Sequence, residues 1–301
     1  MPELITQTEL STFSRCEQRH NLRYNKWLTP FEESPALTMG SAFHAGIEAL
    51  SEEAAVSYLR DNPSSTSWDR WESDAASIRE ATVSVMVKGA LKRWASWPSV
   101  QEVQFEIPIR HPVTGNASKK HRFSGVFDGV WERGEEHPDH PYEIVLGEWK
   151  TASVVNNDYI QRLEIDFQIS TYMWAASILY KEPVRKVVYR VVKKPTIRQK
   201  KTESAQEYIE RLSLDYEERP EHYFFEEVIE RTDEQLADWH RQAWAIHERI
   251  LQIKRGGLPI KNVQSCIGRG RCPYFDHCTG HTTEDAFKKL PRKHREIKEK
   301  K

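Results

Sequence analysis

The sequence predicts an α/β fold in which a mixed central sheet is flanked by helices. Three stretches between residues 103 and 150 alternate as strands do, and their short connections make them antiparallel neighbours. A long helical pattern follows from Tyr159 to Tyr180, and a further strand follows from Val184 to Val192. A helix that crosses back between two strands is typical of an α/β layer and excludes an all-helical protein.

The composition is that of a soluble globular protein and gives no global basic signature. The chain has 301 residues, of which 38% are hydrophobic and 30% charged, and its formal net charge is -1. Any surface for nucleic acid must therefore be local. The opening Met-Pro-Glu-Leu-Ile predicts no signal peptide, and no run of about 18 apolar residues predicts a membrane span. We expect a cytoplasmic protein in a reducing compartment, without a membrane partner.

Residues 1–100 are expected to form a helical N-terminal segment. Its first helix begins near Thr8, a second begins at Gly40 and carries His44, and a third runs from Ser77 to Trp97. A histidine in a crowded helical turn can be a core residue satisfied by a neighbour, so this stretch alone leaves the role of His44 open.

The second strand, Arg122–Trp131, carries an acid where a half-buried strand should be apolar. Asp128 lies between two valines of the same face and between Gly125 and Gly129. A buried acid without a partner costs several kcal/mol, and a metal ion would be such a partner. On the preceding strand, Val103–Ile109, Glu106 is either an acid near the same site or a structural residue without a role there.

The third strand, Tyr142–Lys150, ends in an acid and an amine on one face. Glu148 and Lys150 are two positions apart, so their backbones lie about 6.6 Å apart and their long side chains can converge. An acid that holds a metal beside a lysine that meets a water or a phosphate is a hydrolytic arrangement. The alternative for an isolated pair is a surface ion pair at a strand end.

The C-terminal half adds three features. In the helix after Lys150, Gln168 and Tyr172 share one face. A second amphipathic helix extends from Leu236 to Ile253. Beyond the fourth strand lies a basic loop, which is either solvated or binds phosphate. Its basic residues are Lys193, Lys194, Arg198, Lys200 and Lys201.

The order of these motifs resembles the RecB-type branch of the PD-(D/E)XK nuclease superfamily. The motifs are Gly-x-x-x-His ending at His44, Gly-x-x-Asp-Gly around Asp128, Glu-x-Lys from Glu148 to Lys150, and Gln-x-x-x-Tyr from Gln168 to Tyr172. The resemblance implies a nuclease core over residues 101–228 and a helix and cysteine segment over 229–280. Residues 281–301 are charged and lack apolar periodicity, so we expect them to form a mobile tail. In the Glu-x-Lys motif, this chain has Glu148 at a position where the superfamily more often has aspartate, and both acids occur there.

The resemblance also implies a role for each matching residue. Asp128, Glu148 and the backbone carbonyl of Trp149 would bind Mg²⁺ or Mn²⁺, with His44 as a further ligand. Lys150 would position or deprotonate the attacking water and steady charge on the phosphate. Gln168 and Tyr172 would contact the DNA backbone or brace the site.

The cysteines lie near the two ends of the chain, at Cys16 and at Cys266, Cys272 and Cys278. In the AddB and CRISPR-adaptation exonuclease relatives, one N-terminal cysteine joins three C-terminal ones around a 4Fe–4S cluster. The resemblance implies the same cluster here, although the first C-terminal gap is five residues and the usual one is two. Zinc in a Cys₄ site is the alternative.

These features together predict a metal-dependent deoxyribonuclease, an exonuclease on single-stranded DNA ends in recombination, repair, or phage or CRISPR DNA processing. Protein partners in a recombination or replication complex are a further expectation. Two alternatives stay open: a non-catalytic DNA-binding or complex-forming subunit that keeps the nuclease fold, and a zinc-stapled binding module.

Overall fold

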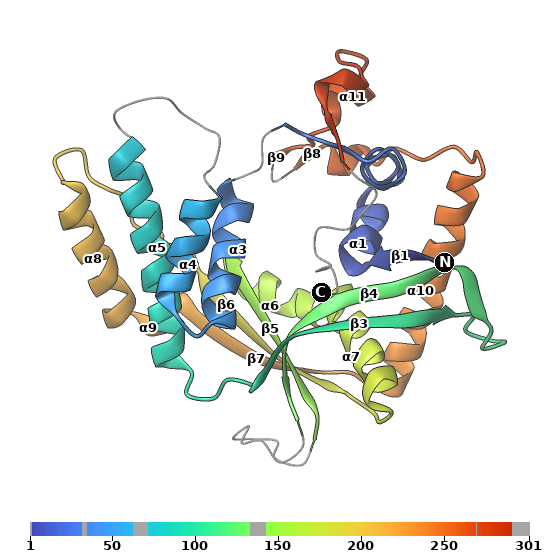
Figure 1. Cartoon of the computed structure of the whole chain (residues 1–301), viewed down its shortest axis with the longest axis horizontal. Coiled ribbons are helices and arrows are strands. Elements are labelled where there is room, and N and C mark those ends of the chain that lie inside the picture. Colours follow the sequence, from blue (N-terminus) through green and yellow to red (C-terminus); the bar gives the residue numbers. More distant parts are fainter. Residues whose placement is uncertain (1, 32–34, 63–71, 133–142, 269, 291–301) are drawn as a thin grey trace.

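The structure, a computed structural model of the chain, describes residues 2–31, 35–62, 72–132, 143–268 and 270–290. Tyr142, where the expected third strand begins, lies outside the described residues. The charged stretch from 291 to 301 also lies outside them. Within the described ranges, the chain forms a mixed sheet with helices on both faces (Figure 1).

Several helices begin where a short polar side chain caps them. Ser204 and Thr232 each take part in a capping box, with Glu207 and Gln235 as the partners three residues on. The described helices are α1 (Gln7–Arg15), α2 (Glu17–His20), the π-helical turn η1 (Asn21–Asn25), α3 (Pro35–Glu48), α4 (Glu52–Asp61), α5 (Glu72–Arg93), α6 (Asn157–Leu163), α7 (Phe167–Tyr180), α8 (Ala205–Glu218), α9 (Pro220–Tyr223), α10 (Asp233–Lys254), the 3-10 turn η2 (Val263–Ser265), α11 (Phe275–Cys278) and the 3-10 turn η3 (Glu284–Ala286).

The strands form one six-stranded sheet and two short ribbons. The sheet order is β1-β4-β5-β6-β7, with β3 also paired to β4. The described strands are β1 (Glu3–Thr6), β2 (Leu28–Thr29), β3 (Val100–Arg110), β4 (Ala117–Trp131), β5 (Val145–Ala152), β6 (Lys186–Lys193), β7 (Phe224–Glu230), β8 (Ile267–Gly268), β9 (Gly270–Arg271) and β10 (Lys288–Lys289).

The strand directions confirm the predicted α/β layer. Strands β3 and β5 are both antiparallel to β4, as their short connections require. Strand β6 is parallel to β5, because α6 and α7 carry the chain back across the sheet between them. Strand β7 then adds an antiparallel edge.

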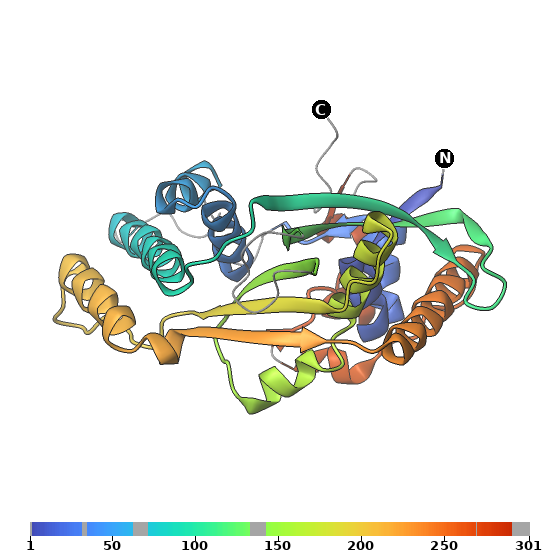
Figure 2. The same cartoon turned by 90° about the horizontal axis from the view of Figure 1, so that it is seen from below.

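One edge of the long strand β4 is shared by two strands. Strand β1 pairs with residues 121–124, β5 pairs with residues 129–131, and the four residues between them pair with neither. The opposite edge pairs with β3 along most of its length. Figure 2 shows the β3–β4 ribbon extending past the other strands of the sheet. The opening between β1 and β5 leaves backbone groups and side chains of β4 available for other partners.

The sheet separates two hydrophobic cores. One face packs against α1, α7 and α10, around buried residues such as Leu10, Phe127 and Trp239. The other face packs against α3, α5 and α8, around residues such as Phe43 and Tyr216. Figure 1 shows the first helix group on the right of the molecule and the second on the left.

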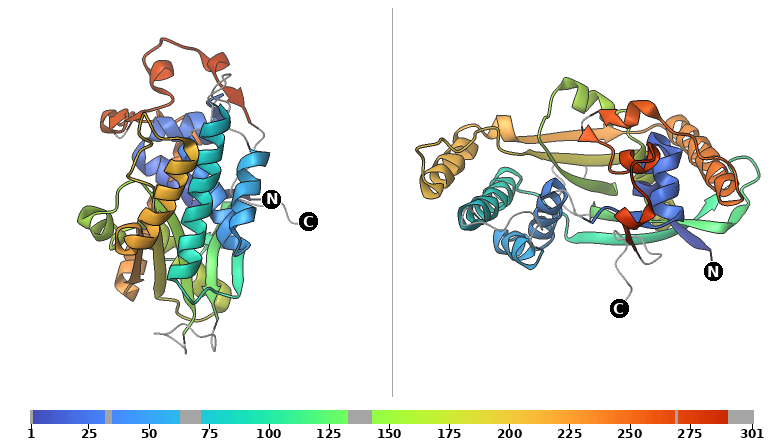
Figure 3. Two further views of the ribbon diagram at one scale, coloured as in Figure 1. Left: turned by 90° about the vertical axis from the view of Figure 1, so that its left-hand side faces the viewer. Right: turned by 90° about the horizontal axis from the view of Figure 1, so that it is seen from above.

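The two ends of the described chain meet beside α1. Strand β10 pairs with β2, the N–H of Leu290 donates to the carbonyl of Trp27, and Tyr274 is buried with Leu22 and Leu28. Figures 1 and 3 show the segment with α11 standing over α1. Residues 281–290 are therefore held against the N-terminal segment, whereas we expected a mobile tail to begin at residue 281.

Several element boundaries differ from the sequence prediction. Thr6, in an extended conformation, caps α1 by accepting a hydrogen bond from the N–H of Glu9, so this helix starts before the expected cap at Thr8. Helix α3 begins at Pro35, before Gly40, and α5 ends at Arg93, before Trp97. Strand β1 was not predicted, because its four residues are too few to show a period. Strand β7, with the sequence Phe-Phe-Glu-Glu-Val-Ile-Glu, was not predicted because its apolar and polar residues do not alternate.

No helix in the described ranges is long and apolar enough to cross a bilayer.

Candidate active site

Three acidic residues line up across neighbouring strands. Glu102 of β3 stands opposite Asp128 of β4, because the pairs on either side of them are Gln101 with Gly129 and Val103 with Phe127. Glu148 of β5 directly follows the pair of Gly129 and Gly147. The sheet register therefore places three carboxylates in one row at the opening between β1 and β5.

Asp128 marks the point where β4 and β5 separate. Their backbone pairing runs from Trp131 and Val145 to Gly129 and Gly147 and then stops. At the next step Asp128 Oδ2 accepts a 2.8 Å hydrogen bond from the backbone N–H of Trp149. The aspartate side chain takes the place of a backbone acceptor, which fixes its orientation toward β5.

His44 of α3 completes a group of donors with Glu102 and Asp128. A ring nitrogen of His44 and one carboxylate oxygen from each acid all lie within 4.8 Å of one another. Burial lowers the pKa of His44, and the negative charge of Asp128 opposes this effect. The ring also bonds to the backbone of Trp149. A neutral imidazole with two carboxylates is a donor set that divalent metals accept.

Glu148 is almost completely buried and only partly satisfied. Its side chain is 2% exposed, and its Oε1 accepts hydrogen bonds from Lys150 and, at 2.7 Å, from Gln168. Its Oε2 has no hydrogen-bond partner among the described residues. Burial and the nearby charge of Asp128 raise the pKa of Glu148 to about 8, although Lys150 opposes them. A buried carboxylate oxygen without a hydrogen-bond partner is suited to bind a cation.

Lys150 faces partly outward beside Glu148. Its side chain is 31% exposed, and its ammonium contacts Glu148 Oε1. Burial acts to lower the pKa of Lys150, but the charges of Glu148 and Asp128 outweigh it, so the pKa is raised. Lys150 therefore stays protonated in the metal-free protein, as a cation available to a phosphate.

The structure brings together most of the residues that the sequence singled out, and adds one. His44, Asp128, Glu148, Lys150 and Gln168 lie in one contiguous group with the backbone of Trp149, as their contacts above establish. Glu102 was missed, because the expected strand began one residue later, at Val103. It has a φ of 54°, which is uncommon for a residue with a side chain and interrupts the strand pattern.

Two other residues selected from the sequence, Tyr172 and Glu106, lie outside the group of metal donors. Tyr172 packs edge-on against Phe105 and Phe127 within the hydrophobic core, one turn beyond Gln168. Glu106, a candidate acid, forms a 2.6 Å ion pair with Arg122 at a half-exposed position and does not belong to the donor group. Three residues separate it from Glu102, and the register places Glu102 opposite Asp128.

The basic loop is anchored by the helices around it. The carbonyls of Lys193 and Ile197 accept hydrogen bonds from tyrosine hydroxyls of α8, and the ammonium of Lys193 contacts His222. Burial lowers the pKa of Lys194. Lys200 and Lys201 are exposed at the turn before α8. The loop therefore presents its outer lysines to solvent on a fixed backbone.

The four cysteines converge although two hundred and more residues separate the first from the others. The Asn262 N–H contacts Cys16 Sγ at 3.4 Å, and Cys266 Sγ contacts the Asn262 carbonyl at 3.5 Å. Burial raises the pKa of Cys278, and the charges of Cys272, Cys16 and Cys266 raise it further. All four are free cysteines. No three of their sulfurs fall within 4.8 Å of one another in the described chain.

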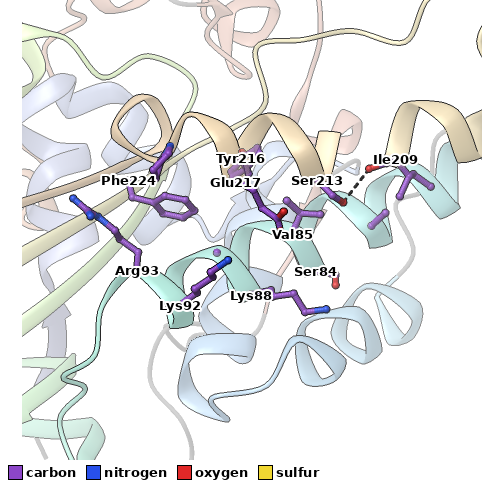
Figure 4. A pocket seen from close by; sticks show the side chains of 13 residues that line it. Ser84, Val85, Lys88, Lys92, Arg93, Ile209, Ser213, Tyr216, Glu217 and Phe224 are labelled. Atoms are coloured by element: carbon purple, nitrogen blue, oxygen red, sulfur yellow. Dashed lines mark hydrogen bonds between the residues drawn. The ribbon is translucent and has the colours of Figure 1, made fainter. Parts of the chain in front are cut away.

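A separate cavity of about 470 Å³ lies between α5 and α8 (Figure 4). Val85, Ile209 and Phe224 contribute apolar surface, while Lys88 and Lys92 stand at its rim. None of its lining residues belongs to the donor group or to the cysteine segment.

The fold and the acidic row define a nuclease of the PD-(D/E)XK type, in which acids and a lysine converge where central strands separate. A model of the PD-(D/E)XK nuclease superfamily matches residues 4–279, and the chain belongs to this family. Members of the superfamily use divalent metal ions and act on DNA.

The structure is also similar to a solved one. A crystal structure of a protein from Eubacterium rectale, named "Putative exonuclease", has a TM-score of 0.51 and 14% sequence identity. The match covers 92% of this chain and 94% of that one, so the likeness extends over the whole fold. No curated protein matches the sequence.

Proposed function

We propose that this protein is a metal-dependent deoxyribonuclease that acts as an exonuclease on single-stranded DNA ends. The observation that carries the proposal is the donor set at the opening of the sheet. Glu102, Asp128 and His44 form a compact group, and Glu148 beside them keeps one buried oxygen without a partner among the described residues. The name of the Eubacterium rectale neighbour supports the exonuclease class.

Asp128, Glu148, His44 and the backbone carbonyl of Trp149 would hold Mg²⁺ or Mn²⁺, with Glu102 as an additional ligand. When bound, such a cation polarises the phosphoryl oxygen and lowers the pKa of a water molecule. Asp128 is oriented for this role by the N–H of Trp149. The neutral imidazole of His44 leaves a nitrogen lone pair for coordination.

The chain's other groups would bind and orient the DNA. Lys150, charged and partly exposed, would position the attacking water and stabilise the negative charge that develops on the phosphate. Gln168 holds Glu148 Oε1 at 2.7 Å and so orients this acid. Tyr172 would brace α7 against β3 and β4 from the core. The basic loop, with Lys193, Lys194, Arg198, Lys200 and Lys201, would follow the DNA backbone.

We further propose membership of the RecB-type branch, with a 4Fe–4S cluster on Cys16, Cys266, Cys272 and Cys278. Tetrahedral zinc with bonds of about 2.3 Å would bring thiolate sulfurs to about 3.8 Å from one another. The spread of the sulfurs in the described chain is wider than that. A cluster interposes iron and sulfide between the thiolates and therefore suits the wider spacing.

Three consecutive parts of the chain would supply the residues of these proposed sites. Residues 1–100 supply His44 and Cys16, residues 101–228 supply the nuclease core, and residues 229–280 supply the remaining cysteines. Processing of DNA in recombination, repair, or phage or CRISPR pathways, in the cytoplasm and with protein partners, is the setting that this proposal implies.

Digestion of end-labelled single-stranded and double-stranded DNA with and without Mn²⁺ tests the proposal. We expect Mn²⁺-dependent loss of nucleotides from single-stranded ends by the wild-type protein. Glu148→Ala should abolish cleavage and keep the fold and most DNA binding, because it removes only a ligand of the proposed cation. Cleavage by Glu148→Ala at the wild-type rate would contradict the assignment. DNA binding without any cleavage by the wild-type protein would instead favour a non-catalytic subunit.

A further inference from the structure

Behind the acidic row, a buried arginine is enclosed by tryptophans. Arg190 of β6 is 4% exposed. Its guanidinium lies within 5.4 Å of the ring centroids of four indoles, which come from the end of α5, the following loop, β4 and β5. These residues are Trp94, Trp97, Trp131 and Trp149. We call Arg190 and the four tryptophans the arginine cage.

Hydrogen bonds fix the position of the guanidinium within the cage. Arg190 Nε donates to Glu226 Oε2 at 2.6 Å, and its terminal nitrogen donates to the carbonyl of Ser96 at 2.7 Å. Ser96 also accepts, through its hydroxyl, the indole N–H of Trp131. A planar guanidinium can stack on aromatic faces while it donates in its own plane, and an ammonium cannot. The cage is therefore a rigid unit with a specific need for arginine.

Within the cage, the Trp149 indole lies between the other cage residues and two glycines. A Cβ atom at Gly147 would lie 2.4 Å from the Trp149 ring, and one at Gly129 would lie 3.1 Å from it. Trp97 and Trp131 contact the same ring edge-on, with centroids 5.1 and 5.8 Å away. A side chain at Gly147 would displace the indole, whereas a Cβ at Gly129 would first meet Pro98, 2.5 Å away, and would crowd the indole less closely.

The backbone of Trp149 belongs to the proposed metal site. Its N–H holds Asp128, its backbone bonds to the ring of His44, and its neighbours in sequence are Glu148 and Lys150. The indole points to the face of the sheet opposite to Glu148 and Lys150, into the core with α3 and α5. A small rotation of the indole would therefore move all of these groups together.

We propose that the arginine cage positions the metal ligands by locking the Trp149 indole, so that Arg190 is a positioning residue for cation binding. This inference rests on the proposed metal-dependent function. A cage that only stabilised the core would affect unfolding and leave the cation affinity of the folded protein unchanged. The two roles therefore differ in a property that can be measured without DNA.

The test is Mn²⁺ binding to the full chain, measured by calorimetry and by electron paramagnetic resonance. Three variants are compared with the wild-type protein. Arg190→Lys keeps the positive charge but lacks the planar guanidinium group. Trp149→Phe removes the indole, and Gly147→Ala displaces it. The matched control is Trp239→Phe, because Trp239 is also buried and its Nε1 also lacks a partner among the described residues. Thermal unfolding of each variant is recorded alongside.

We expect about tenfold weaker Mn²⁺ binding in the cage variants that fold, with wild-type affinity in Trp239→Phe at a comparable loss of melting temperature. The Mn²⁺ concentration that gives half-maximal cleavage should rise by the same factor, while KM for DNA stays within about twofold of the wild-type value. Wild-type Mn²⁺ affinity in folded Trp149→Phe and Gly147→Ala would overturn the inference and leave the nuclease proposal standing. A wild-type protein that neither binds Mn²⁺ nor cleaves DNA would overturn both.

Discussion

The backbone N–H of Trp149 donates a 2.8 Å hydrogen bond to Asp128 Oδ2 where β4 and β5 stop pairing. This bond takes the place of the next backbone hydrogen bond between the two strands. Strand β4 contributes a side-chain acceptor to it, and β5 contributes a backbone donor. The separation of the strands and the orientation of the acid therefore have one origin. Because both strands have fixed partners on their other sides, Asp128 and Glu148 are held close before any cation arrives.

Glu102→Gln should weaken Mn²⁺ binding about tenfold or more, because it removes one charge from the donor group without changing its shape. The matched control is Glu106→Gln on the same strand, which breaks an exposed ion pair with Arg122 and should leave Mn²⁺ affinity unchanged. Calorimetric titration compares the two. Equal effects of both substitutions would show that Glu102 is not a ligand.

Mn²⁺ affinity should rise with pH, because the pKa of Glu148 is raised to about 8 in the metal-free protein and a cation requires the deprotonated carboxylate. We expect an increase of about tenfold per pH unit below pH 8, with release of one proton per ion. Titrations in buffers of different ionisation enthalpy count that proton. A binding constant that does not vary between pH 6 and 8 would contradict the raised pKa.

The same shift makes a prediction for stability without metal. A carboxyl whose pKa is raised on folding, here from 4.5 to about 8, binds its proton more tightly in the folded state. Its contribution to stability is complete below about pH 4.5 and is lost as the pH rises through about 8. The melting temperature of the metal-free protein should therefore fall over this window, and Glu148→Gln should remove that part of the fall.

The basic loop is expected to bind phosphates through its outer lysines. Changing Lys200 and Lys201 to Gln should lower the slope of log K against log salt on single-stranded DNA by about 0.7 per lost contact. The control pair is Lys119 and Lys120, which are equally exposed but lie on the β3–β4 hairpin. If both double variants keep the wild-type slope, the loop is merely solvated.

The cysteine segment should contain iron. The protein purified without oxygen is expected to be brown, with about four iron and four sulfide per chain. Cys16→Ser should lose the colour and lower the melting temperature by about 5 °C or more, because cluster binding contributes directly to folding. Colourless wild-type protein with stoichiometric zinc would exclude the cluster and leave the nuclease proposal intact.

The sequence predicted the central hairpins and the crossover because their signals are local. The alternation from Arg122 to Trp131 lies within β4. The single helix expected from Tyr159 to Tyr180 is divided into α6 and α7, because Asp166 caps a new helix start at Phe167. Strand β1 could not be predicted, because four residues show no usable period and its partner, at His121–Ser124, is more than a hundred residues away. Its pairing depends on the tertiary fold.

The candidate site was predictable where it consists of short motifs. Glu148, Lys150 and Gln168 could be selected from their spacing, whereas Glu102 could not. Its position opposite Asp128 depends on the register of β3 and β4, and that register shifts between Pro108 and Arg110 near the hairpin turn. Counting residues outward from the turn would therefore have placed the wrong residue opposite Asp128.

The contacts between the two ends of the chain have a consequence for synthesis of the protein. Glu17 pairs with Arg249, and Cys16 Sγ contacts the carbonyl of Ile260, 244 residues later. At roughly 5–20 residues per second, a ribosome needs about 12–50 s to cover that distance. During that time the apolar face of α1, with Leu10 and Phe13, has no helix α10 to cover it. The nascent chain therefore exposes this apolar face until the ribosome reaches the last sixth of the sequence.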